Sequence, residues 1–402
     1  MGVDVPAFIR LLREGDVNAA LEVIIQSNCL PSVCGRICSA PCEIACVLTD
    51  EGADPIGIRH LERYAADFGK VQKSREKIVR AGKKVAIIGA GPSGLSAAMQ
   101  LARKGYQVTI FEALDKPGGV MRYGVPEFRI SKKSLDKDIN LFKHFGIEIK
   151  TTHFMGQNMR LKDILSQGFS ALLLASGAGM PKFMELPGAN LGGVYYGEEF
   201  LMRVNLTKAN FFAKYIPTFR IGKKVAVIGS GNTALDCARA AVRFGRTVTL
   251  LFRRTEEEMR VQKVEREYGK EEGICFEPLV RPIEILGDQN YFVRGLKCVR
   301  MDYADPEQTD HWKLMEVPES EFIMDVDTVI IAIGHRPNTL VRKFSTGLNI
   351  NDDETIYVDE QTGMTSIEGI FAAGNVVTNA GPVVEALASG KKAAESIDQY
   401  LR

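Results

Sequence analysis

The spacing of the cysteines offers the first chemistry in this sequence. Five of the eight cysteines lie between Cys29 and Cys46, and four of these recur at every fourth residue, at Cys34, Cys38, Cys42 and Cys46. Iron–sulfur clusters take several thiolates from one short loop, whereas zinc sites usually carry C-x2-C pairs, which are absent here. A disulfide framework needs an oxidising compartment. The spacing favours a [4Fe–4S] cluster held by these four residues over zinc or over inert cysteines.

Two glycine-rich turns form an internal repeat. The segment from Gly82 to Gly89 recurs between Gly222 and Gly229, 140 residues further along the chain. Each copy predicts a buried strand that enters a glycine turn, followed by an alanine-rich helix and a second strand, at 108–111 or 248–251. This order is the β-α-β unit that binds dinucleotides.

Each turn predicts a phosphate cradle. The first glycine makes the tight turn, the second lets a pyrophosphate approach the backbone, and the third position lets helix and strand pack closely. The predicted binding residues are Gly89, Gly91, Pro92, Ser93 and Gly94 in the first turn, and Gly229, Gly231, Asn232, Thr233 and Ala234 in the second.

The ends of the second strands separate the two nucleotides. Glu112 follows the first unit, where a carboxylate accepts both ribose hydroxyls of an adenosine that lacks a 2′-phosphate. The matching position in the second unit is Phe252, followed by Arg253 and Arg254. Two guanidiniums can bind a phosphate in fork geometry. The first unit is therefore predicted to bind FAD and the second NADP(H) rather than NAD(H), the alternative being that the two arginines are surface charges.

Further segments are typical of a flavin site. A helix that starts near residue 383 would stabilise negative charge on a reduced flavin if its N-terminus pointed at the ring. Additional FAD-binding residues are predicted at Gly119, Arg122, Gly124, Gly374, Asn375, Pro382 and Val383. Two more strand–glycine junctions, at 172–177 and 329–334, mark where the chain leaves and re-enters the flavin domain, and Gly334 is assigned to the NAD(P) site.

Composition limits the class of protein. The 402 residues are 45% apolar and carry a net charge of +1, which excludes a disordered or fibrous protein and gives no reason to expect nucleic-acid binding. No apolar run reaches the about 18 residues of a membrane span. The N-terminus lacks the features of a secretory signal, so we expect a cytoplasmic protein without a membrane span.

The predicted fold is α/β, with two Rossmann-like dinucleotide-binding domains preceded by a small helical iron–sulfur domain. Helical spacing predicts two short helices between Pro6 and Ile25, broken at Gly15, and another over 58–68, followed by a charged linker at 70–84. The predicted domains are residues 1–80 for the cluster, 81–180 and 335–402 for FAD, and 181–334 for NAD(P), inserted in the FAD domain.

Some residues are assigned to structure rather than chemistry. Three isolated cysteines, Cys237, Cys275 and Cys298, are interpreted as core residues. The five histidines have no partner that sequence alone reveals, and each is interpreted as structural; they are His60, His144, His153, His311 and His335.

These motifs, taken in order, resemble the small-subunit family of NADPH-dependent glutamate synthase. The same module occurs in dihydropyrimidine dehydrogenase and in bifurcating ferredoxin:NADP transhydrogenases. The resemblance covers essentially the whole chain and rests on the segments 34–38, 41–46, 122–129, 253–259 and 371–375. It implies one FAD, one NADP(H) and [4Fe–4S] chemistry, places Cys38, Cys42 and Cys46 at ligand positions of the family, and places Glu62 where the family can offer a non-cysteine ligand.

The sequence also departs from the family. Members usually carry an upstream cysteine-rich segment, and the stretch from Gly2 to Pro6 resembles the residues that come just after that segment, so two complete clusters are not expected from this chain alone. The four clustered cysteines hold one cluster, or a partner supplies the missing thiolates, or the start is truncated. Asn375 replaces the usual aspartate beside the ribityl chain, and Ser176 replaces a threonine.

The leading hypothesis is a flavoprotein oxidoreductase subunit that exchanges electrons between NAD(P)H and ferredoxin or an iron–sulfur partner subunit, in a hetero-oligomeric redox complex. A related alternative feeds NADPH electrons to a glutamate-synthase-type or sulfur-reducing partner. A self-contained disulfide reductase would need a C-x-x-C pair in the second unit, which is absent. A flavin monooxygenase or amine oxidase needs no cysteine-rich domain, so the segment from Cys34 to Cys46 argues against those enzymes. A non-enzymatic scaffold would be purified without bound flavin. Since FAD carries the chemistry, no catalytic side chain is predicted.

Overall fold

A computed structural model describes residues 1–71, 82–156, 160–207, 219–304, 313–338 and 345–402. These residues form two compact units. The first unit comprises Met1–Arg122, Glu127–Met180 and Arg336–Arg402, and the second comprises Tyr123–Pro126 and Pro181–His335. The predicted charged linker falls largely on residues 72–81, which lie outside the described residues. The three-domain division stays a prediction.

Helices built on side-chain caps begin the first unit. Asp4 accepts a hydrogen bond from the backbone N–H of Ala7 at the start of α1, and Asp16 accepts one from Ala19 at the start of α2. Such caps satisfy N–H groups that a helix N-terminus leaves without partners. The helices are α1 (Val5–Arg13), α2 (Val17–Ser27), α3 (Pro31–Ile37), α4 (Pro41–Ile44), the 3₁₀ helix η1 (Val47–Thr49) and α5 (Ile58–Phe68). The two predicted N-terminal helices and the helix over 58–68 are confirmed.

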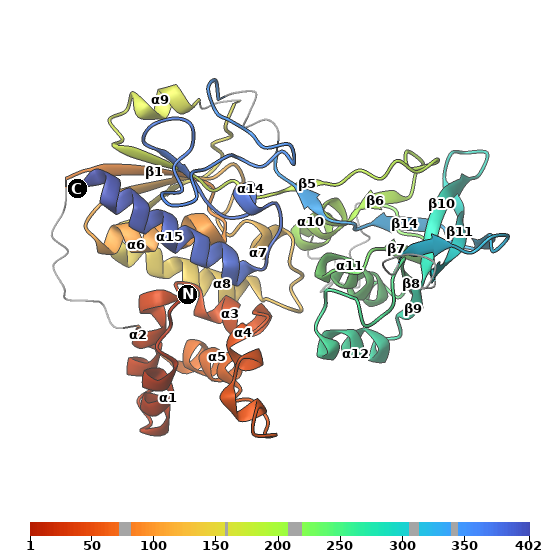
Figure 1. Cartoon of the computed structure of the whole chain (residues 1–402), viewed down its shortest axis with the longest axis horizontal. Coiled ribbons are helices and arrows are strands. Elements are labelled where there is room, and N and C mark those ends of the chain that lie inside the picture. The colour runs from red at the N-terminus through yellow and green to blue at the C-terminus, as the bar shows by residue number, and fades with distance from the viewer. Residues whose placement is uncertain (72–81, 157–159, 208–218, 305–312, 339–344) are drawn as a thin grey trace. The chain divides into compact units, whose positions relative to one another are not determined.

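A five-stranded parallel sheet forms the centre of the first unit (Figure 1). The strand order is β16-β4-β1-β2-β3, so the first and second strands of the predicted β-α-β unit are neighbours. The strands are β1 (Lys84–Ile88), β2 (Gln107–Phe111), β3 (Glu148–Lys150), β4 (Ala171–Leu174) and β16 (Ile370–Ala372). Their Val, Ile and Leu residues suit a sheet that is covered on both faces.

Two long helices, α6 (Pro92–Arg103) and α15 (Val383–Leu401), pack against each other beside this sheet. Gly390 of α15 has no room for a side chain, because a Cβ there would lie 2.0 Å from the Ser93 carbonyl oxygen of α6. The other helices of the first unit are α7 (Val120–Tyr123), whose last residue belongs to the second unit, α8 (Lys132–Asn140), η2 (Leu141–Phe145), α9 (Leu161–Leu165) and α14 (Asn375–Thr378).

The second unit repeats the parallel architecture. Its sheet has the order β6-β14-β7-β8-β9 and is flanked by α10 (Gly197–Thr207), α11 (Asn232–Arg243) and α12 (Lys263–Glu271). The strands are β6 (Val194–Tyr196), β7 (Lys224–Ile228), β8 (Thr247–Phe252), β9 (Cys275–Pro278) and β14 (Thr328–Ile331). The α/β fold with two dinucleotide-type sheets is confirmed. Two short strands, β5 (Met180–Pro181) and β15 (His335–Arg336), pair where the chain passes between the units.

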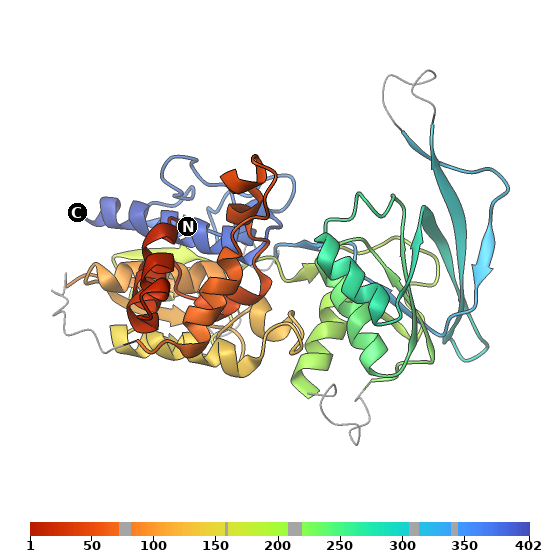
Figure 2. The ribbon, with the colours of Figure 1, turned by 90° about the horizontal axis from the view of Figure 1, so that it is seen from below.

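An antiparallel sheet, which the sequence did not predict, completes the second unit. It is formed by β10 (Val280–Gly287), β11 (Val293–Tyr303), β12 (Leu314–Glu316) and β13 (Phe322–Met324). Its Val280, Leu296 and Cys298 join Ile228 and Leu251 of the parallel sheet in one hydrophobic cluster. Figure 2 shows this sheet on the face of the parallel sheet opposite α11 and α12.

Within the described ranges, no single helix combines the length and apolar composition needed to cross a membrane. One bent pair, Pro31–Ile37 with Pro41–Thr49, reaches that criterion by length and composition only.

Candidate functional site

The first glycine turn has the shape of a backbone cradle. At Gly89 a Cβ would lie 2.4 Å from the carbonyl oxygen of Ala175, and φ is +106°. At Gly94 a Cβ would lie 2.0 Å from the Gly89 carbonyl oxygen, so helix α6 packs directly against the turn. A Cβ on Gly91 would meet nothing within 4 Å. The turn is therefore closed on its protein side and open at Gly91, which fits the approach of a pyrophosphate.

Glu112 lies beside this turn, directly after β2. Its side chain is buried, and its two carboxylate oxygens accept hydrogen bonds from the backbone N–H groups of Ala90, at 2.7 Å, and Leu114, at 3.0 Å. Burial raises the pKa of Glu112. Because each carboxylate oxygen can accept a further hydrogen bond, the position fits the predicted ribose contact.

The structure brings other predicted flavin residues to the same place. A Cβ on Gly374 would lie 2.5 Å from Ser93 Oγ, and a Cβ on Gly119 would lie 2.9 Å from Gly91 Cα. Asn375 begins α14, and Pro382 precedes the first residue of α15, Val383. Pro92 begins α6. Gly119 and Gly374 therefore lie against the first glycine turn, and Asn375, Pro382 and Val383 lie at the starts of α14 and α15. The fit of this turn to FAD rests on a crowded backbone that is open at Gly91.

Arg122 and Gly124 are also predicted FAD-binding residues, but their surroundings in the structure differ from those of the residues above. The buried Arg122 donates a hydrogen bond to the Pro117 carbonyl oxygen at 2.6 Å and forms an ion pair with Asp136. Its guanidinium therefore holds the loop after the turn. Gly124 belongs to the short segment grouped with the second unit. Their predicted contacts with FAD stay predictions.

The second glycine turn repeats the first in detail. A Cβ on Gly229 would lie 2.3 Å from the Ala332 carbonyl oxygen, and a Cβ on Gly231 would meet nothing within 4 Å. Asn232, Thr233 and Ala234 then form the first turn of α11. The third position of this turn is Ala234, where the first turn has Gly94. The Ala234 Cβ lies 3.1 Å from the position that a Cβ on Gly229 would take, so this turn accommodates an alanine.

Two exposed arginines follow β8 as predicted. Arg254 lies 3.9 Å from the Glu258 carboxylate, and this carboxylate also accepts a hydrogen bond from the Thr255 backbone N–H at 3.0 Å. Among the described residues Arg253 has no ion-pair partner. Its guanidinium is therefore available to an anionic ligand, whereas that of Arg254 is shared with an acid.

Two features of the second unit were missed by sequence reasoning. Arg260 forms an isolated parallel bridge with Gly231, which brings a third arginine beside the turn. The sequence reveals no partner for His335, which is interpreted as structural; in the structure its Nδ1 pairs with the Glu198 carboxylate and its Nε2 lies 3.3 Å from Thr233 Oγ1. In the sequence Thr233 is 102 positions and Glu198 is 137 positions from His335, so no local motif could have revealed these contacts. Gly334, which precedes His335, has a φ of +115°.

The clustered cysteines differ in accessibility. Cys34 is buried in α3, Cys38 and Cys46 are partly exposed, and Cys42 is exposed. Burial raises the pKa values of the Cys34, Cys38 and Cys42 thiols, and the nearby Glu62 carboxylate raises each of them further. Since iron binds the thiolate, cluster assembly at these residues would release protons.

The Glu62 carboxylate is close enough to act on three of these thiols, those of Cys34, Cys38 and Cys42. Its carboxylate accepts a hydrogen bond from Asn28 Nδ2 at 2.6 Å, and the Cys34 thiol donates to Asn28 Oδ1 at 3.6 Å. Burial raises the pKa of Glu62 to about 7. Within the described part of the chain, no three His, Cys, Asp or Glu side chains converge closely enough to hold a metal ion. The donors suit a cluster chemically, but they do not form a closed site, and the predicted ligation stays a prediction.

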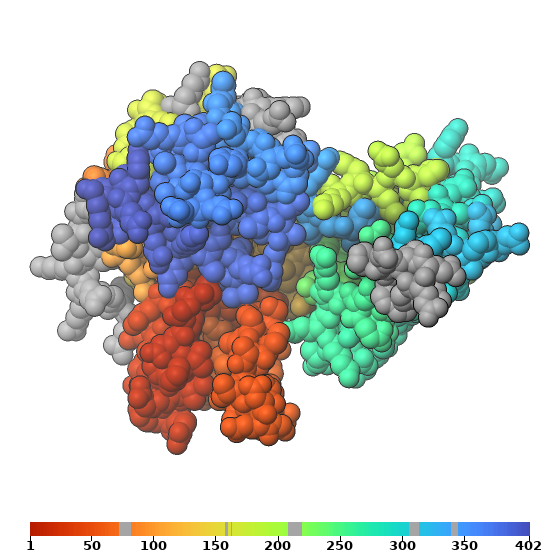
Figure 3. Space-filling model, in the orientation of Figure 1, coloured from red at the N-terminus to blue at the C-terminus, as the bar shows by residue number. Residues whose placement is uncertain are grey.

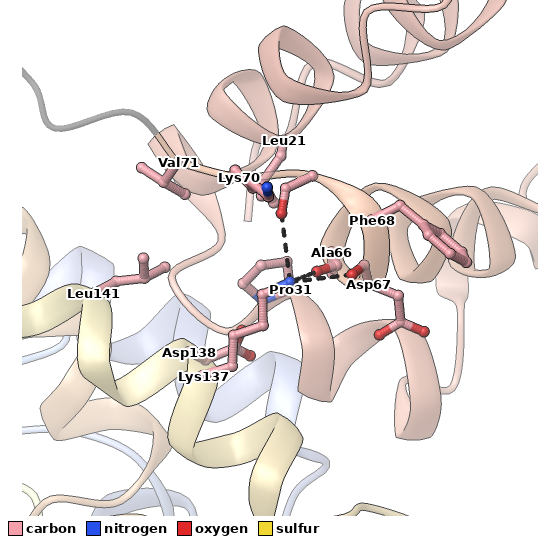
Figure 4. Close-up of a pocket in the computed structure, with 11 residues that line it drawn as sticks. Leu21, Pro31, Ala66, Asp67, Phe68, Lys70, Val71, Lys137, Asp138 and Leu141 are labelled. Atoms are coloured by element: carbon pink, nitrogen blue, oxygen red, sulfur yellow. Dashed lines mark hydrogen bonds between the residues drawn. The ribbon is translucent and has the colours of Figure 1, made fainter.

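The cysteine-bearing helices pack on the rest of the first unit. The buried Asp138 of α8 accepts a hydrogen bond from the Val33 backbone N–H of α3 at 3.3 Å. Lys137 donates to the carbonyl oxygens of Ala66, Asp67 and Gly69 at the end of α5, where a cation complements the helix dipole (Figure 4).

A pocket of about 280 Å³ lies at this packing contact, and Leu21, Pro31 and Leu141 contribute to its lining. Figure 3 shows the N-terminal helices as a lobe projecting from the first unit. The cysteine segment is therefore carried by the unit that contains the first glycine turn.

The isolated cysteines divide into two kinds. Cys237 and Cys298 are buried, as predicted for core residues. Cys275 is exposed, so that prediction is wrong for this residue. The reason is its position at the start of β9, which is an edge strand of the parallel sheet.

Comparison with known proteins agrees with this geometry. The model of the pyridine nucleotide-disulphide oxidoreductase family matches residues 57–133 and 83–390, and the model of dihydropyrimidine dehydrogenase domain II, 4Fe-4S cluster, matches residues 1–74. The structure of Mycobacterium tuberculosis FprA in complex with NADPH has a TM-score of 0.63 at 18% identity, covering 79% of this chain and 84% of that one. At that identity the likeness shows the fold alone.

Curated relatives are more similar in sequence. The NADP(+)-dependent formate dehydrogenase subunit beta of Moorella thermoacetica is 36% identical over 100% of this chain and 59% of its own length. The NADPH-Fe(3+) oxidoreductase subunit beta of Geobacter sulfurreducens is 35% identical over 99% of this chain, which spans 62% of that protein. The glutamate synthase [NADPH] small chain of Escherichia coli is 34% identical, with 99% of this chain and 86% of the relative covered.

The first two of these relatives are thus considerably longer than the part that this chain matches, and all three carry names of subunits or chains of larger enzymes. The oxidoreductase model matches residues 83–390, and relatives more than 30% identical cover nearly the whole chain, so it belongs to the pyridine nucleotide-disulphide oxidoreductase family, among the FAD-type members related to the glutamate synthase small chain.

Proposed function

We propose that this chain is the electron-transferring flavoprotein subunit of a redox complex, in which it exchanges electrons between NADPH and an iron–sulfur partner. The observation that carries this proposal is the pair of equivalent glycine turns, Gly89–Gly94 and Gly229–Ala234, each open at its second glycine. A chain with one dinucleotide site would need only one such turn.

The first turn is proposed to hold FAD. Glu112 binds the ribose, the glycines cradle the pyrophosphate, and the segments that converge on Gly374 and Val383 enclose the rest. When bound, FAD accepts two electrons as a hydride and passes them on singly. The chain's own residues bind and orient the group, and no side chain has to act as a base.

The second turn is proposed to hold NADPH in preference to NADH. Arg253 is exposed and without an ion-pair partner among the described residues, and a 2′-phosphate provides two charge-assisted hydrogen-bond acceptors for it. Arg254, with Glu258 beside it, contributes less to this contact.

The cysteine segment is proposed as the exit for electrons. Cys34, Cys38, Cys42 and Cys46 are the proposed thiolate donors, and Ile44 and Val47 beside them are 76% and 71% exposed. Exposed apolar side chains around accessible cysteines are expected where another protein covers them. We propose that ferredoxin or an iron–sulfur partner subunit docks here, in the cytoplasm, and that thiolates outside the described residues complete any cluster that these cysteines do not close alone.

A second candidate partner is of the glutamate-synthase type. The E. coli small chain is the relative whose length this chain covers most fully among those described above. A sulfur-reducing partner is equally compatible with the site. A self-contained disulfide reductase is disfavoured, because Cys237 and Cys298 are buried and burial raises the pKa of both thiols.

The test is to measure iron, acid-labile sulfide and FAD in the chain purified anaerobically. We expect one FAD per chain and up to about four irons, with iron lost in the Cys38→Ser, Cys42→Ser and Cys46→Ser variants. Cys34→Ser determines whether the buried thiol is a ligand, and exposed Cys275→Ser serves as the matched control. A protein that binds neither FAD nor iron would overturn the proposal, whereas FAD without iron would direct the search to a cysteine-rich partner.

A further inference from the structure

We propose that Glu198, His335 and Thr233, which are in contact through the His335 imidazole, form a relay that couples dinucleotide binding at the second glycine turn to the uptake of one proton by His335. The proposal rests on the proposed function, since it takes this turn to be the site that receives the pyrophosphate. It goes further by assigning a proton to the binding step and a positioning role to three side chains.

The contacts place the imidazole between two partners. His335 follows Gly334 at the end of the loop after β14, and its Nε2 lies 3.3 Å from Thr233 Oγ1. Its Nδ1 pairs with the carboxylate of Glu198, which stands in the first turn of α10. The side chains of His335 and Glu198 are 26% and 21% exposed, so water screens this pair only partly.

Packing fixes the three elements relative to one another. A Cβ on Gly197, at the start of α10, would lie 3.1 Å from Thr233 Cγ2 and 3.0 Å from Ala332 Cβ. The start of α10, the start of α11 and the end of β14 therefore lie in direct contact. Thr233 follows Gly231 by two residues in the same turn, and a Cβ on Gly231 would meet nothing within 4 Å.

The relay has two hydrogen-bonding states. With the imidazole neutral, the Glu198 carboxylate holds the proton on Nδ1, and Nε2 accepts the hydrogen of the Thr233 hydroxyl. The hydroxyl oxygen then offers only lone pairs to a ligand. With the imidazole protonated, Nε2–H donates to Thr233 Oγ1, and the hydroxyl hydrogen becomes free to donate to a phosphate oxygen.

The charges around His335 decide which state is occupied. Among the described residues, Glu198 of α10 and Lys182 after β5 are the charged side chains that act on it. Burial and the Lys182 ammonium lower the pKa of His335, which favours the neutral imidazole in the free protein. Glu198 stabilises the imidazolium once it forms, and a pyrophosphate beside Thr233 adds negative charge that favours it further.

Binding and protonation must then help each other by the same factor. The balance is simple: one proton leaves the solvent and binds Nε2, the Thr233 hydroxyl rotates its hydrogen toward the phosphate, and no electrons move. The consequence is tighter binding of the dinucleotide as the pH falls through neutrality.

The test is calorimetry of NADP⁺ binding to the full chain, at pH 7, in buffers with different enthalpies of ionisation. The slope of the binding enthalpy against the buffer enthalpy gives the number of protons taken up. The 2′-phosphate itself titrates near pH 6, so the diagnostic quantity is the difference between wild type and variant. NAD⁺, which lacks this group, provides the second ligand.

We expect His335→Gln to bind NADP⁺ roughly tenfold more weakly and to take up fewer protons than wild type with both nucleotides. Thr233→Val should give the same loss while leaving the imidazole in place, and Glu198→Gln should reduce the uptake. His144→Gln, at an exposed histidine of the first unit, is the matched control and should change neither quantity.

Intact binding with the same proton uptake in wild type and His335→Gln would overturn the relay alone. Failure of the wild type to bind either nucleotide would overturn the proposed function, and the relay with it. If His335→Gln does not fold, Thr233→Val decides the question by the same comparison.

Discussion

At the scale of single residues, nucleotide preference is assigned to Arg253 and Arg254, which follow β8. Replacing both with alanine should raise the KM for NADPH far more than that for NADH, because charge-assisted hydrogen bonds to the 2′-phosphate are lost at a cost of about 1.5–3 kcal/mol or more. Arg253→Ala alone should account for most of the effect, since Glu258 lies 3.9 Å from Arg254.

Steady-state kinetics with both nucleotides check this prediction. Arg294→Ala, which removes an exposed arginine from β11, is the control and should alter neither KM. Equal increases for NADPH and NADH in the double variant would show that the arginines do not read the 2′-phosphate.

The glycines of the first turn give a matched pair of substitutions. Gly91→Ala adds a methyl group to open space and should leave the thermal unfolding temperature nearly unchanged while lowering the FAD content. Gly94→Ala forces a Cβ to 2.0 Å from the Gly89 carbonyl oxygen and should destabilise the fold itself. Flavin absorbance per chain and thermal melts separate the two effects, and full flavin retention in Gly91→Ala would argue against a cofactor at this turn.

Residue identity and spacing predict candidate site residues from local motifs, but they cannot predict partners that distant segments supply. The two glycine turns, Glu112 and the arginine pair follow local motifs, and the structure places them at strand ends. The partners of His335 come from α10 and α11, so its role depends on tertiary packing that no spacing encodes. The prediction that Cys275 is a core residue is wrong for a similar reason, because only the order of the strands in the sheet reveals that β9 lies at an edge.

At the scale of elements, Asp138 links α8 to the cysteine-bearing α3. Burial raises the pKa of Asp138 from 3.8 to about 7. The folded state therefore holds a proton that the unfolded state releases between these values, so this group's contribution to stability is present below about pH 4 and is lost as the pH rises through 7.

Asp138→Asn should remove this dependence, giving an unfolding free energy closer to that of wild type at pH 5 and higher than that of wild type at pH 8. Urea unfolding followed by circular dichroism at the two pH values measures it. Glu62→Gln is measured in the same way, because burial also raises the pKa of Glu62 to about 7. An unchanged pH dependence in Asp138→Asn would show that its carboxyl does not titrate in this window.

Prediction of elements succeeded where hydrophobic periodicity is regular. The helix over 58–68 and the strands of both β-α-β units match the structure, because each carries an uninterrupted pattern with clear caps or glycines at its ends. The antiparallel strands β10 to β13 were not predicted. The apolar face of these strands packs against Ile228 and Leu251 of the parallel sheet, so the strands' own sequence shows only part of the hydrophobic pattern.

At the scale of the whole molecule, the proposed function lets electrons enter the chain from NADPH at the second unit. They leave it from the segment of Cys34 to Cys46, which belongs to the first unit. The apolar Ile44 and Val47 lie on that segment. Ile44→Lys with Val47→Lys should therefore slow electron transfer to ferredoxin while leaving NADPH-dependent reduction of a small artificial acceptor unchanged. Equal loss with both acceptors would argue against docking at this surface.

The central claim is that this chain binds FAD and that NADPH reduces it. The most direct measurement is an anaerobic titration of the purified chain with NADPH, followed by the visible absorbance of oxidised flavin. We expect stoichiometric FAD that is fully bleached by NADPH and only slowly by NADH, with recovery on adding an iron–sulfur acceptor. Bound flavin that NADPH leaves oxidised, or a chain that binds no flavin, would contradict it.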